Sequence, residues 1–378
     1  MKILIVIDSL GSGGAQKLKG NLAKSLSDLG HVVELFIYNP KGDFFASEFQ
    51  SYGIKIHAVE KKKEGFSLYI VKQLRSIILK HNYDGVISSM HAPSIYAALA
   101  MIGRSVRGRL IVCEESSSNA PVPILKKLLF YLASLSAYSV VANSFNEARL
   151  LKRRPGLSKK THAILNGFEI PAPLKDQPVT QNKDLKLLVV GRIAYPKNGV
   201  NLLKALSLFY DRNGWIPRVE WAGRRDGSFD KSIEMQKEMD KYLLKNTKLS
   251  SKWTWLGEVK DIVSLYRKSD ALLLVSIYEG LPMVICEAMI EGCFVIASNV
   301  CDHPFIIGDE ERGFLCDPLS PESICNSIER LSVMSFSEKS NMIKNAREFA
   351  ELNFDQGSMA SAYESLLIKE NSISNAKV

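Results

Sequence analysis

Two short segments of the chain combine glycines with charged side chains that could bind an anion or hydroxyl groups. The first, 191–199, reads Gly-Arg-Ile-Ala-Tyr-Pro-Lys-Asn-Gly and lies between the apolar run 186–190 and a helix-like stretch that begins at Val200. Backbone N–H groups at the start of a helix attract anions, and Arg192 and Lys197 add two positive charges. The segment is therefore a candidate diphosphate site, although a turn with two exposed cations would explain it equally well on its own.

The second segment follows another apolar run, 270–276, and contains Glu279-Gly280-Leu281-Pro282 and then Glu287. Two carboxylates suit the binding of sugar or ribose hydroxyls, while Gly280 would allow the backbone to approach a ligand. Pro282 fits the first position of a helix. Taken alone, Glu287 could also be an ordinary solvent-facing helical residue. Because both segments follow predicted strands, we expect them at the carboxyl-terminal edge of one parallel sheet.

The elements that must position these segments are apolar runs alternating with amphipathic stretches of helical length. The runs lack in-and-out alternation, which is typical of parallel strands covered by helices on both faces. In the first half of the chain they are 3–7, 31–37, 54–59, 84–89 and 109–113. The pattern restarts with 186–190, 218–222, 252–256, 270–276 and 294–298. The sequence therefore predicts an α/β protein with two doubly wound parallel sheets.

A chain of 378 residues is too long for one compact core, and 166–186 is a proline-containing polar stretch without periodicity. We interpret this stretch as the linker between a first domain, 1–168, and a second, 169–354. A helix is expected near 355–370, and its pattern does not say on which domain it packs. The composition, 46% hydrophobic and 24% charged, excludes collagen-like, low-complexity and wholly disordered classes.

Charge is distributed unevenly along the chain. Residues 1–168 contain 23 basic and 11 acidic side chains, whereas the remainder contains 26 and 29. The basic half favours a polyanionic partner, either nucleic acid or an anionic membrane surface, with an ordinary solvated basic face as the alternative. We find no recognisable nucleic-acid-binding motif and no aromatic residues interleaved with the basic clusters, which argues against nucleic acid.

Cysteine and apolar patterns indicate a reduced, cytoplasmic setting. The six cysteines form no C-x-x-C pair, and Lys2 is followed by only five apolar residues before Asp8, so we predict no signal peptide. The uncharged stretches 85–103 and 128–146 are interpreted as a helix joined to a buried strand, not as membrane spans. Without a D-x-D sequence or a His or Cys pair at zinc spacing, we predict no metal site.

The stretch 186–298 resembles the nucleotide-sugar domain of retaining glycosyltransferases of the GT-B fold. Gly191-Arg192 with Lys197 resembles the diphosphate clamp of that family, and Glu279 through Glu287 resembles its E-x7-E signature. Three further segments are similar to the family at corresponding places: 142–144, 166–169 and 256–259. The resemblance covers nearly the whole chain. It implies two Rossmann-like domains facing across a cleft, with the acceptor in 1–168, the donor in 169–354, and the C-terminal stretch 355–378 packed back on the first domain.

The resemblance also implies roles for single residues in binding a UDP-sugar. Arg192 and Lys197 would neutralise the β-phosphate as the glycosidic bond breaks, which stabilises the leaving group. Glu287 would bind the ribose and Glu279 would face the donor sugar. The residues that complete the expected donor site are Val259 near the base, Gly280, Leu281 and Pro282 in the loop before the helix, and Gly13 and Gly14 over the phosphates.

The glycine-rich segment 11–16 is weak evidence when taken by itself. It follows a predicted strand and precedes a predicted helix, as a phosphate-binding loop does. However, it is neither G-x-G-x-x-G nor a Walker sequence, so a plain strand-to-helix turn explains it nearly as well.

One departure from the family concerns a histidine that related enzymes carry after the strand corresponding to 110–113. This chain has Cys113-Glu114-Glu115 there. Glu114 or Glu115 could replace the histidine as a hydrogen-bonding or charge-stabilising group, and we favour Glu115. His91, at the end of the predicted strand 84–89, could reach the same site, or it could be a buried polar or helix-capping residue.

The resemblance thus implies a retaining glycosyltransferase that needs no metal or other cofactor. It would move a hexose or N-acetylhexosamine from a UDP-sugar to a lipid-linked or lipopolysaccharide saccharide in bacterial surface glycan synthesis. Its basic first domain would bind the cytoplasmic face of the inner membrane through two clusters of cations, Lys126 and Lys127, and Lys152 to Arg154 with Lys159 and Lys160. The alternatives are a UDP-sugar epimerase of the same fold and a non-catalytic protein at the membrane surface. A dinucleotide-dependent oxidoreductase would carry G-x-G-x-x-G after its first strand, and this sequence does not have that motif there.

Overall fold

The computed structural model describes residues 1–11, 14–41, 44–62, 64–103, 109–115, 122–172, 184–227, 229–308 and 310–368. The chain divides into two compact units. Unit 1 comprises Met1–Glu169 and Phe354–Val378, and unit 2 comprises Ile170–Asn353. The chain passes from unit 1 to unit 2 inside the predicted linker and returns to unit 1 just before the last helix.

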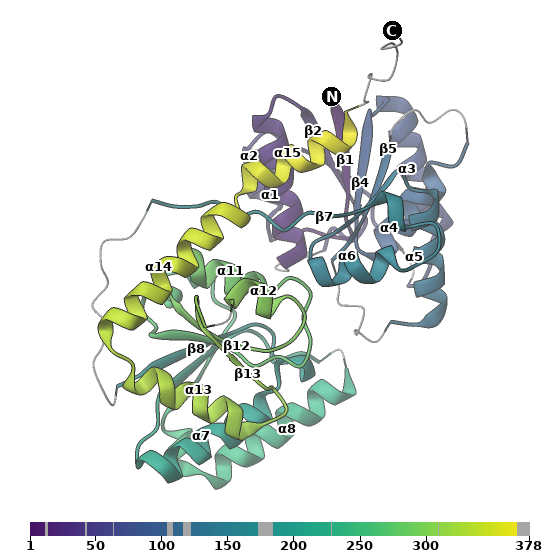
Figure 1. Cartoon of the computed structure of the whole chain (residues 1–378). Coiled ribbons are helices and arrows are strands. Elements are labelled where there is room, and N and C mark those ends of the chain that lie inside the picture. Colours follow the sequence, from purple (N-terminus) through teal and green to yellow (C-terminus); the bar gives the residue numbers. More distant parts are fainter. Residues whose placement is uncertain are drawn as a thin grey trace. The chain divides into compact units, whose positions relative to one another are not determined.

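Unit 1 is built on a seven-stranded sheet in the order β3-β2-β1-β4-β5-β6-β7 (Figure 1). Every neighbouring pair of these strands is parallel. The strands are β1 (Lys2–Val6), β2 (Val32–Ile37), β3 (Lys55–Ala58), β4 (Gly85–Ser89), β5 (Arg109–Glu114), β6 (Ser139–Ala142) and β7 (Thr161–Ala163). The helices are α1 (Gly14–Asp28), α2 (Ala46–Ser51), α3 (Leu68–His81), α4 (His91–Ala100), α5 (Ile124–Ser136), α6 (Phe145–Lys152), η1 (Ser158–Lys160) and α15 (Gln356–Leu367).

The position of β1 in the sheet explains why apolar and polar residues do not alternate along this strand. Ile3 and Ile5 belong to the core on the face covered by α1, α2 and α15. Leu4 and Val6 belong to the core on the other face, with α3, α4 and α5. Since both faces are covered by helices, the four buried positions Ile3 to Val6 are all apolar.

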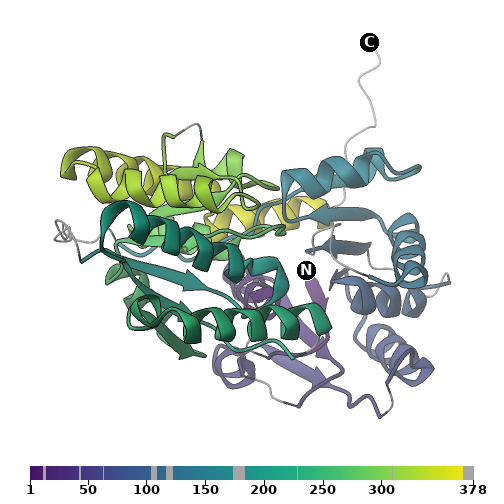
Figure 2. The same cartoon turned by 90° about the horizontal axis from the view of Figure 1, so that it is seen from below.

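Unit 2 repeats the design with a six-stranded parallel sheet in the order β10-β9-β8-β11-β12-β13. Its strands are β8 (Lys186–Val190), β9 (Arg218–Ala222), β10 (Trp253–Gly257), β11 (Ala271–Leu274), β12 (Phe294–Ser298) and β13 (Phe314–Cys316). Its helices are η2 (Tyr195–Lys197), α7 (Gly199–Asn213), α8 (Asp230–Lys245), α9 (Thr247–Ser250), α10 (Ile262–Arg267), α11 (Met283–Ile290), α12 (His303–Ile307), α13 (Pro321–Val333) and α14 (Phe336–Asn353). Figure 2 shows this unit from below, with helices on both faces of its sheet.

The strand order places a topological switch point in each sheet. In unit 2 the chain leaves β8 for β9 on one side, and later fills the other side with β11. Ligands of open parallel α/β sheets bind at such a point, beyond the carboxyl ends of the strands. The two loops at the switch point are 191–198 and 275–282, which are the segments singled out in the sequence.

The last helix, α15, packs on unit 1 against α1. The N–H of Phe168 donates to Phe354 O at 2.7 Å, and the N–H of Gly167 donates to the Met359 sulfur at 3.1 Å. The short strands β7 and β13 were not predicted, because three residues are too few to form a visible pattern. Among the described helices, none has both the length and the apolar content needed to cross a bilayer.

Candidate active site

The loop after β8 folds back so that Lys197 covers Gly191. Gly191 has φ 136°, and a Cβ at this position would lie 2.8 Å from the Lys197 Cε. The single turn η2 ends at Lys197, and Asn198 then adopts the left-handed region with φ 58° before α7 begins. This tight path places the Lys197 ammonium directly beyond the end of β8.

Two residues that the sequence did not reveal fix this loop. The Asn198 side chain is buried, and its Nδ2 donates to Val275 O at 3.1 Å and to Pro318 O at 2.6 Å. It therefore joins the loop after β8 to the end of β11. Gly223 allows close approach from the other side, since a Cβ there would lie 1.9 Å from Gly191 O. Neither contact follows from a local motif, because both depend on pairing between distant segments.

Lys197 and Glu279 form the centre of the candidate donor site. Lys197 Nζ lies 2.5 Å from Glu279 Oε1, and the Ser276 hydroxyl donates to the same oxygen at 2.6 Å. Burial opposes ionisation of Glu279, but the Lys197 charge and these hydrogen bonds outweigh it and lower the pKa of the carboxyl. With side chains 17% and 18% exposed, the pair is partly open to a ligand.

Arg192 lies on the same loop with most of its guanidinium exposed. Its Nη1 is 3.5 Å from Asp226 Oδ1, and the exposed fractions of the two side chains are 57% and 4%. The Ser232 hydroxyl donates to the other oxygen of Asp226 at 3.2 Å. Asp226, which the sequence did not single out, thus anchors one side of Arg192 and leaves the rest free to meet an anion.

The second carboxylate lies on α11. Tyr266 donates its hydroxyl hydrogen to Glu287 Oε2 at 2.9 Å. The predicted place of Pro282 was wrong by one position: Pro282 precedes α11 as its N-cap, and its carbonyl accepts from Ile285 N–H at 2.9 Å. Gly280 is not one of the described glycines with a positive φ. Any role that requires glycine at this position therefore depends on its small size.

The remaining predicted donor residues lie in loops or next to them. Leu281 is buried before α11, and Val259 follows the end of β10. The carbonyl of Gly257, two residues before Val259, accepts from Gly223 N–H at 2.7 Å, which places this loop beside the Gly191 loop. Gly14 is the first residue of α1 in unit 1, whereas Gly13 lies outside the described residues.

A buried histidine is linked to the loop of Glu279 through Ser298. His303 is fully buried at the start of α12, and its Nδ1 lies 2.7 Å from Ser298 O. The Ser298 hydroxyl donates to Ser276 O at 2.6 Å. Because burial disfavours the charged imidazole, the pKa of His303 falls to about 4.

This histidine should make unit 2 sensitive to acid. Between pH 6.5 and 4 the unfolded chain protonates His303 and the folded chain does not, so the free energy of unfolding should fall as the pH decreases. We expect a loss of about 2 kcal/mol from this group between pH 7 and pH 5. All four tryptophans lie in unit 2, so urea unfolding followed by tryptophan fluorescence measures it. His303→Asn should flatten the pH dependence by this amount, and an unchanged slope would contradict the assignment.

In unit 1, the predicted residue Glu115 belongs to a buried ionic cluster. Lys19 Nζ lies 2.6 Å from Glu115 Oε1, with side chains only 3% and 5% exposed. Ser89 donates to the other carboxylate oxygen at 2.7 Å, and Lys19 also donates to the Tyr363 hydroxyl at 3.1 Å. The cluster joins α1, the ends of β4 and β5, and α15, so Glu115 is already engaged by protein groups.

His91, the alternative to Glu115, pairs with the neighbouring carboxylate. Its Nε2 lies 3.2 Å from Glu114 Oε2, and its ring contacts Phe130 edge-on at 4.5 Å between centroids. The two side chains are 13% and 9% exposed. They line a small cavity together with Val122, Lys127, Phe130, Glu147, Leu150, Leu151 and Arg154. The structure therefore places His91 and Glu115 in two different clusters of unit 1.

One group of possible metal ligands occurs among the described residues, away from the switch point. Ligand atoms of Glu34, His57 and His81 lie within 4.8 Å of one another. Lys2 Nζ, however, lies 3.4 Å from Glu34 Oε1 and 3.4 Å from His81 Nδ1. Tyr83 and His57 hydrogen-bond the other oxygen of Glu34. Protein groups thus already surround the carboxylate, and the group fits a polar network better than an ion site.

Comparison with known proteins gives matches to glycosyltransferases along both units. The model of the family described as "Glycosyl transferases group 1" matches residues 173–349, and that of "Glycosyltransferase Family 4" matches residues 12–170. The fold is that of the GT-B glycosyltransferases. Anabaena Alr3699/HepE, solved in complex with UDP-glucose, superposes with a TM-score of 0.81 at 20% identity, over 97% of this chain and 99% of that chain. Residues 173–349 thus match a group 1 glycosyltransferase model and residues 12–170 a family 4 glycosyltransferase model, so a glycosyltransferase domain covers most of each unit.

Two curated relatives are bacterial glycosyltransferases. One, from Campylobacter jejuni, is 26% identical over 84% of this chain and 85% of its own length. Its name describes an α-1,4-N-acetyl-D-galactosaminyltransferase that acts on a diNAcBac-PP-undecaprenol saccharide. The other, from Escherichia coli, is 26% identical over 73% of this chain and 72% of its own length. It is named a UDP-Gal:α-D-GlcNAc-diphosphoundecaprenol α-1,3-galactosyltransferase.

Proposed function

We propose that this protein transfers a hexose or N-acetylhexosamine from a UDP-sugar to a lipid-linked or lipopolysaccharide saccharide, with retention of anomeric configuration, in bacterial surface glycan synthesis. One observation carries the proposal: two cations and two carboxylates, Arg192, Lys197, Glu279 and Glu287, flank the switch point of unit 2. A nucleoside diphosphate sugar presents the matching groups, which are an anionic diphosphate and the hydroxyls of ribose and sugar.

The diphosphate would compete with Glu279 for Lys197. In the free protein the Lys197 ammonium is neutralised by Glu279 at 2.5 Å. A β-phosphate would draw this ammonium to itself, and the exposed side of Arg192 would supply a second charge. Negative charge grows on the β-phosphate as the glycosidic bond breaks, so both cations stabilise the transition state more than the ground state. We propose that they do this without a metal ion or other cofactor.

The two carboxylates would then bind hydroxyl groups. Glu279 has a lowered pKa and is ionised at neutral pH, which makes it an acceptor for donor-sugar hydroxyls. Glu287, oriented by Tyr266, would accept from the ribose, while Val259 would lie near the base. Gly280, Leu281 and Pro282 would shape the loop between the carboxylates. Retention could follow from attack on the same face, with the departing phosphate accepting the proton of the acceptor.

Unit 1 would receive the acceptor at the carboxyl edge of its own sheet. We propose the His91–Glu114 pair as the hydrogen-bonding group near the sugar, because it lines a cavity. Glu115, compensated by Lys19, would hold α1, which begins at Gly14, in position. The basic surface of this unit would bind the inner face of the cell membrane from the cytoplasm.

Ligand-induced stabilisation tests the donor site. The melting temperature should be measured in EDTA with UDP, GDP, NAD and several UDP-sugars. A ligand at 100 times its dissociation constant adds about 2.7 kcal/mol to the free energy of unfolding, which raises the melting temperature by a few degrees. We expect UDP and at least one UDP-sugar to stabilise the protein without metal. Stabilisation by NAD alone, or by UDP only with added Mg²⁺, would contradict the proposal.

A second measurement separates the transferase from a UDP-sugar epimerase. An epimerase interconverts UDP-sugars with no acceptor, whereas a transferase consumes the donor only when an acceptor or water is attacked. Proton NMR of each UDP-sugar incubated with the protein alone should therefore show no epimeric UDP-sugar. Appearance of the epimer would favour the alternative function.

A further inference from the structure

Helix α5 in unit 1 exposes a continuous apolar face. Its inner side is buried through Phe130, Ala133 and Ser134. The opposite side should be polar if it faced water, since a surface helix normally carries charged residues there. Instead, it carries large apolar side chains, namely Ile124 (86% exposed), Leu125 (67%), Leu128 (51%), Leu129 (38%), Leu132 (51%) and Leu135 (38%). Such a contiguous patch on a folded protein marks an interaction surface.

The spacing makes this patch one stripe. Leu125, Leu128, Leu132 and Leu135 are separated by three, four and three residues, which places them on one side of a helix. The helix has 13 residues, so it is about 20 Å long and shorter than the hydrocarbon core of a bilayer, about 30 Å. A helix of this kind can lie along a membrane surface with its apolar face in the headgroup region.

The charges around the stripe indicate what kind of partner binds it. Between residues 122 and 163 the chain has eight basic residues and one acidic residue, Glu147, which is 2% exposed. The segment after α6 packs on α5, because Tyr131 donates to Pro155 O at 2.8 Å and Lys160 Nζ donates to Leu135 O at 2.6 Å. Exposed charge on this part of unit 1 is therefore positive. A second copy of the chain would bring like charges together, whereas an anionic bilayer complements them.

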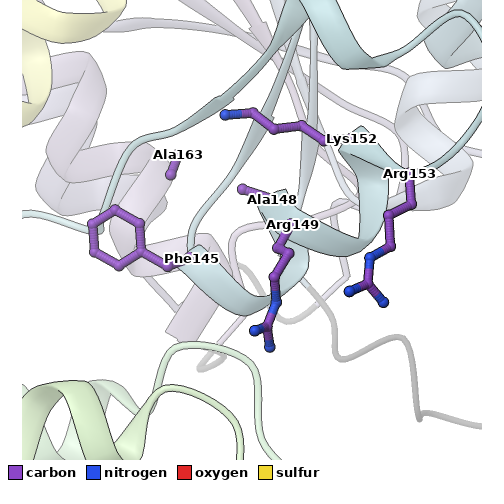
Figure 3. Close-up of a pocket in the computed structure, with 6 residues that line it drawn as sticks. All are labelled: Phe145, Ala148, Arg149, Lys152, Arg153 and Ala163. Atoms are coloured by element: carbon purple, nitrogen blue, oxygen red, sulfur yellow. The ribbon is translucent and has the colours of Figure 1, made fainter.

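Helix α6 adds a basic hollow to this surface. An open depression of ≈ 500 Å³ is lined by Phe145, Ala148, Arg149, Lys152, Arg153 and Ala163. Figure 3 shows the side chains of Arg149 and Arg153 extending from α6 in the same direction. Guanidinium groups bind phosphate oxygens through paired hydrogen bonds, so this hollow suits lipid phosphates next to the apolar stripe.

We propose that α5 is an interfacial helix, which inserts the stripe of Leu125, Leu128, Leu132 and Leu135 into an anionic bilayer while Arg149 and Arg153 contact lipid phosphates. This inference deepens the proposed function, on which it rests, by naming the surface that meets the membrane. The inner side of α5 contributes Lys127 and Phe130 to the cavity of His91 and Glu114. Docking through the outer side would therefore bring lipid-linked saccharides next to that cavity.

Co-sedimentation with vesicles tests the inference. Wild-type protein should bind vesicles of equal parts phosphatidylglycerol and phosphatidylcholine, and bind phosphatidylcholine alone much less. Leu128→Glu with Leu132→Glu should lower the partition coefficient at least about tenfold, because two apolar side chains no longer insert. Arg149→Gln with Arg153→Gln should lower binding to the anionic vesicles about fivefold per cation. The control is Leu244→Glu with Val333→Glu, which changes two apolar residues of unit 2 that are 81% and 83% exposed.

The outcomes separate this inference from the proposed function. Absence of vesicle binding by the wild type, or equal binding by the Leu128 and Leu132 variant, would overturn it. So would a concentration-dependent dimer that the same variant abolishes in sedimentation velocity. The far-UV circular dichroism of the variant should match that of the wild type, which shows that unit 1 also folds, and its stabilisation by UDP should be unchanged. Leu128→Ala with Leu132→Ala serves if the first variant does not fold. Vesicle binding without any response to UDP would instead contradict the donor site and leave the docking surface standing.

Discussion

Lys197→Ala is expected to lower the rate of sugar transfer by about 10²–10³-fold, the usual effect of removing one preorganised charge from a transition state. Lys197 is the cation closest to Glu279 and lies at the switch point beyond β8. Without it, negative charge that develops on the β-phosphate is opposed by Arg192 alone. UDP should also bind more weakly, because the product keeps the diphosphate. The measurements are initial rates of UDP release with acceptor and the UDP-dependent shift in melting temperature.

Matched variants distinguish this role from a structural one. Lys204→Ala removes an exposed lysine from α7, the helix that follows the loop, and should leave both quantities unchanged. Glu279→Gln removes the carboxylate but keeps the ammonium, so it should bind UDP at least as tightly as the wild type while transferring sugar slowly. Transfer by Lys197→Ala within a factor of two of the wild-type rate would show that the β-phosphate is not neutralised here.

Lys19→Met should have the largest effect on stability in unit 1. The side chain is 3% exposed and compensates Glu115, which is equally enclosed. Breaking a buried ion pair by removing one partner costs about 3–5 kcal/mol, because the remaining charge stays buried without compensation. Urea unfolding combined with pulsed hydrogen exchange, read in peptides of β4, β5 and α1, measures this loss in unit 1 separately from unit 2.

The double variant and an exposed lysine provide the controls. Lys19→Met with Glu115→Gln removes both charges, so it should recover most of the lost free energy of unfolding. Lys17→Met changes an exposed lysine of the same helix and should shift stability by less than about 0.5 kcal/mol. If the single Lys19→Met variant were as stable as the wild type, Lys19 would not be needed to compensate the buried charge of Glu115.

The repeated fold followed from the sequence because strands that are covered on both faces leave a plain signal. Runs such as 187–190 and 294–297 are apolar at every position, and they form most of β8 and β12. The edge strands β7 and β13 left no such signal because each has three residues. Their formation depends on pairing with a neighbour that only the folded sheet provides.

The location of Arg192, Lys197, Glu279 and Glu287 was predictable because these residues lie in short segments that follow strands. The contacts that hold such residues in place were not predictable, because they join residues far apart in the chain. Lys19 and Tyr363, for example, are separated by 344 positions. For the same reason the sequence could not show that Glu115 is enclosed by an ion pair. Asp226, Asn198 and His303 likewise acquire their roles only through burial beside the loops at the switch point.

The central claim is that the chain moves a sugar from a UDP donor to a lipid-linked acceptor. Its most direct test is incubation of the protein, in EDTA, with UDP-sugars labelled in the sugar and with polyprenyl-diphosphate saccharides, followed by organic extraction. The account predicts that label from at least one UDP-hexose or UDP-N-acetylhexosamine enters the extracted lipid through an α-linkage, and that Lys197→Ala largely prevents this. Donors and acceptors that bind without any transfer of label, or label transfer that is indifferent to Lys197, would contradict it.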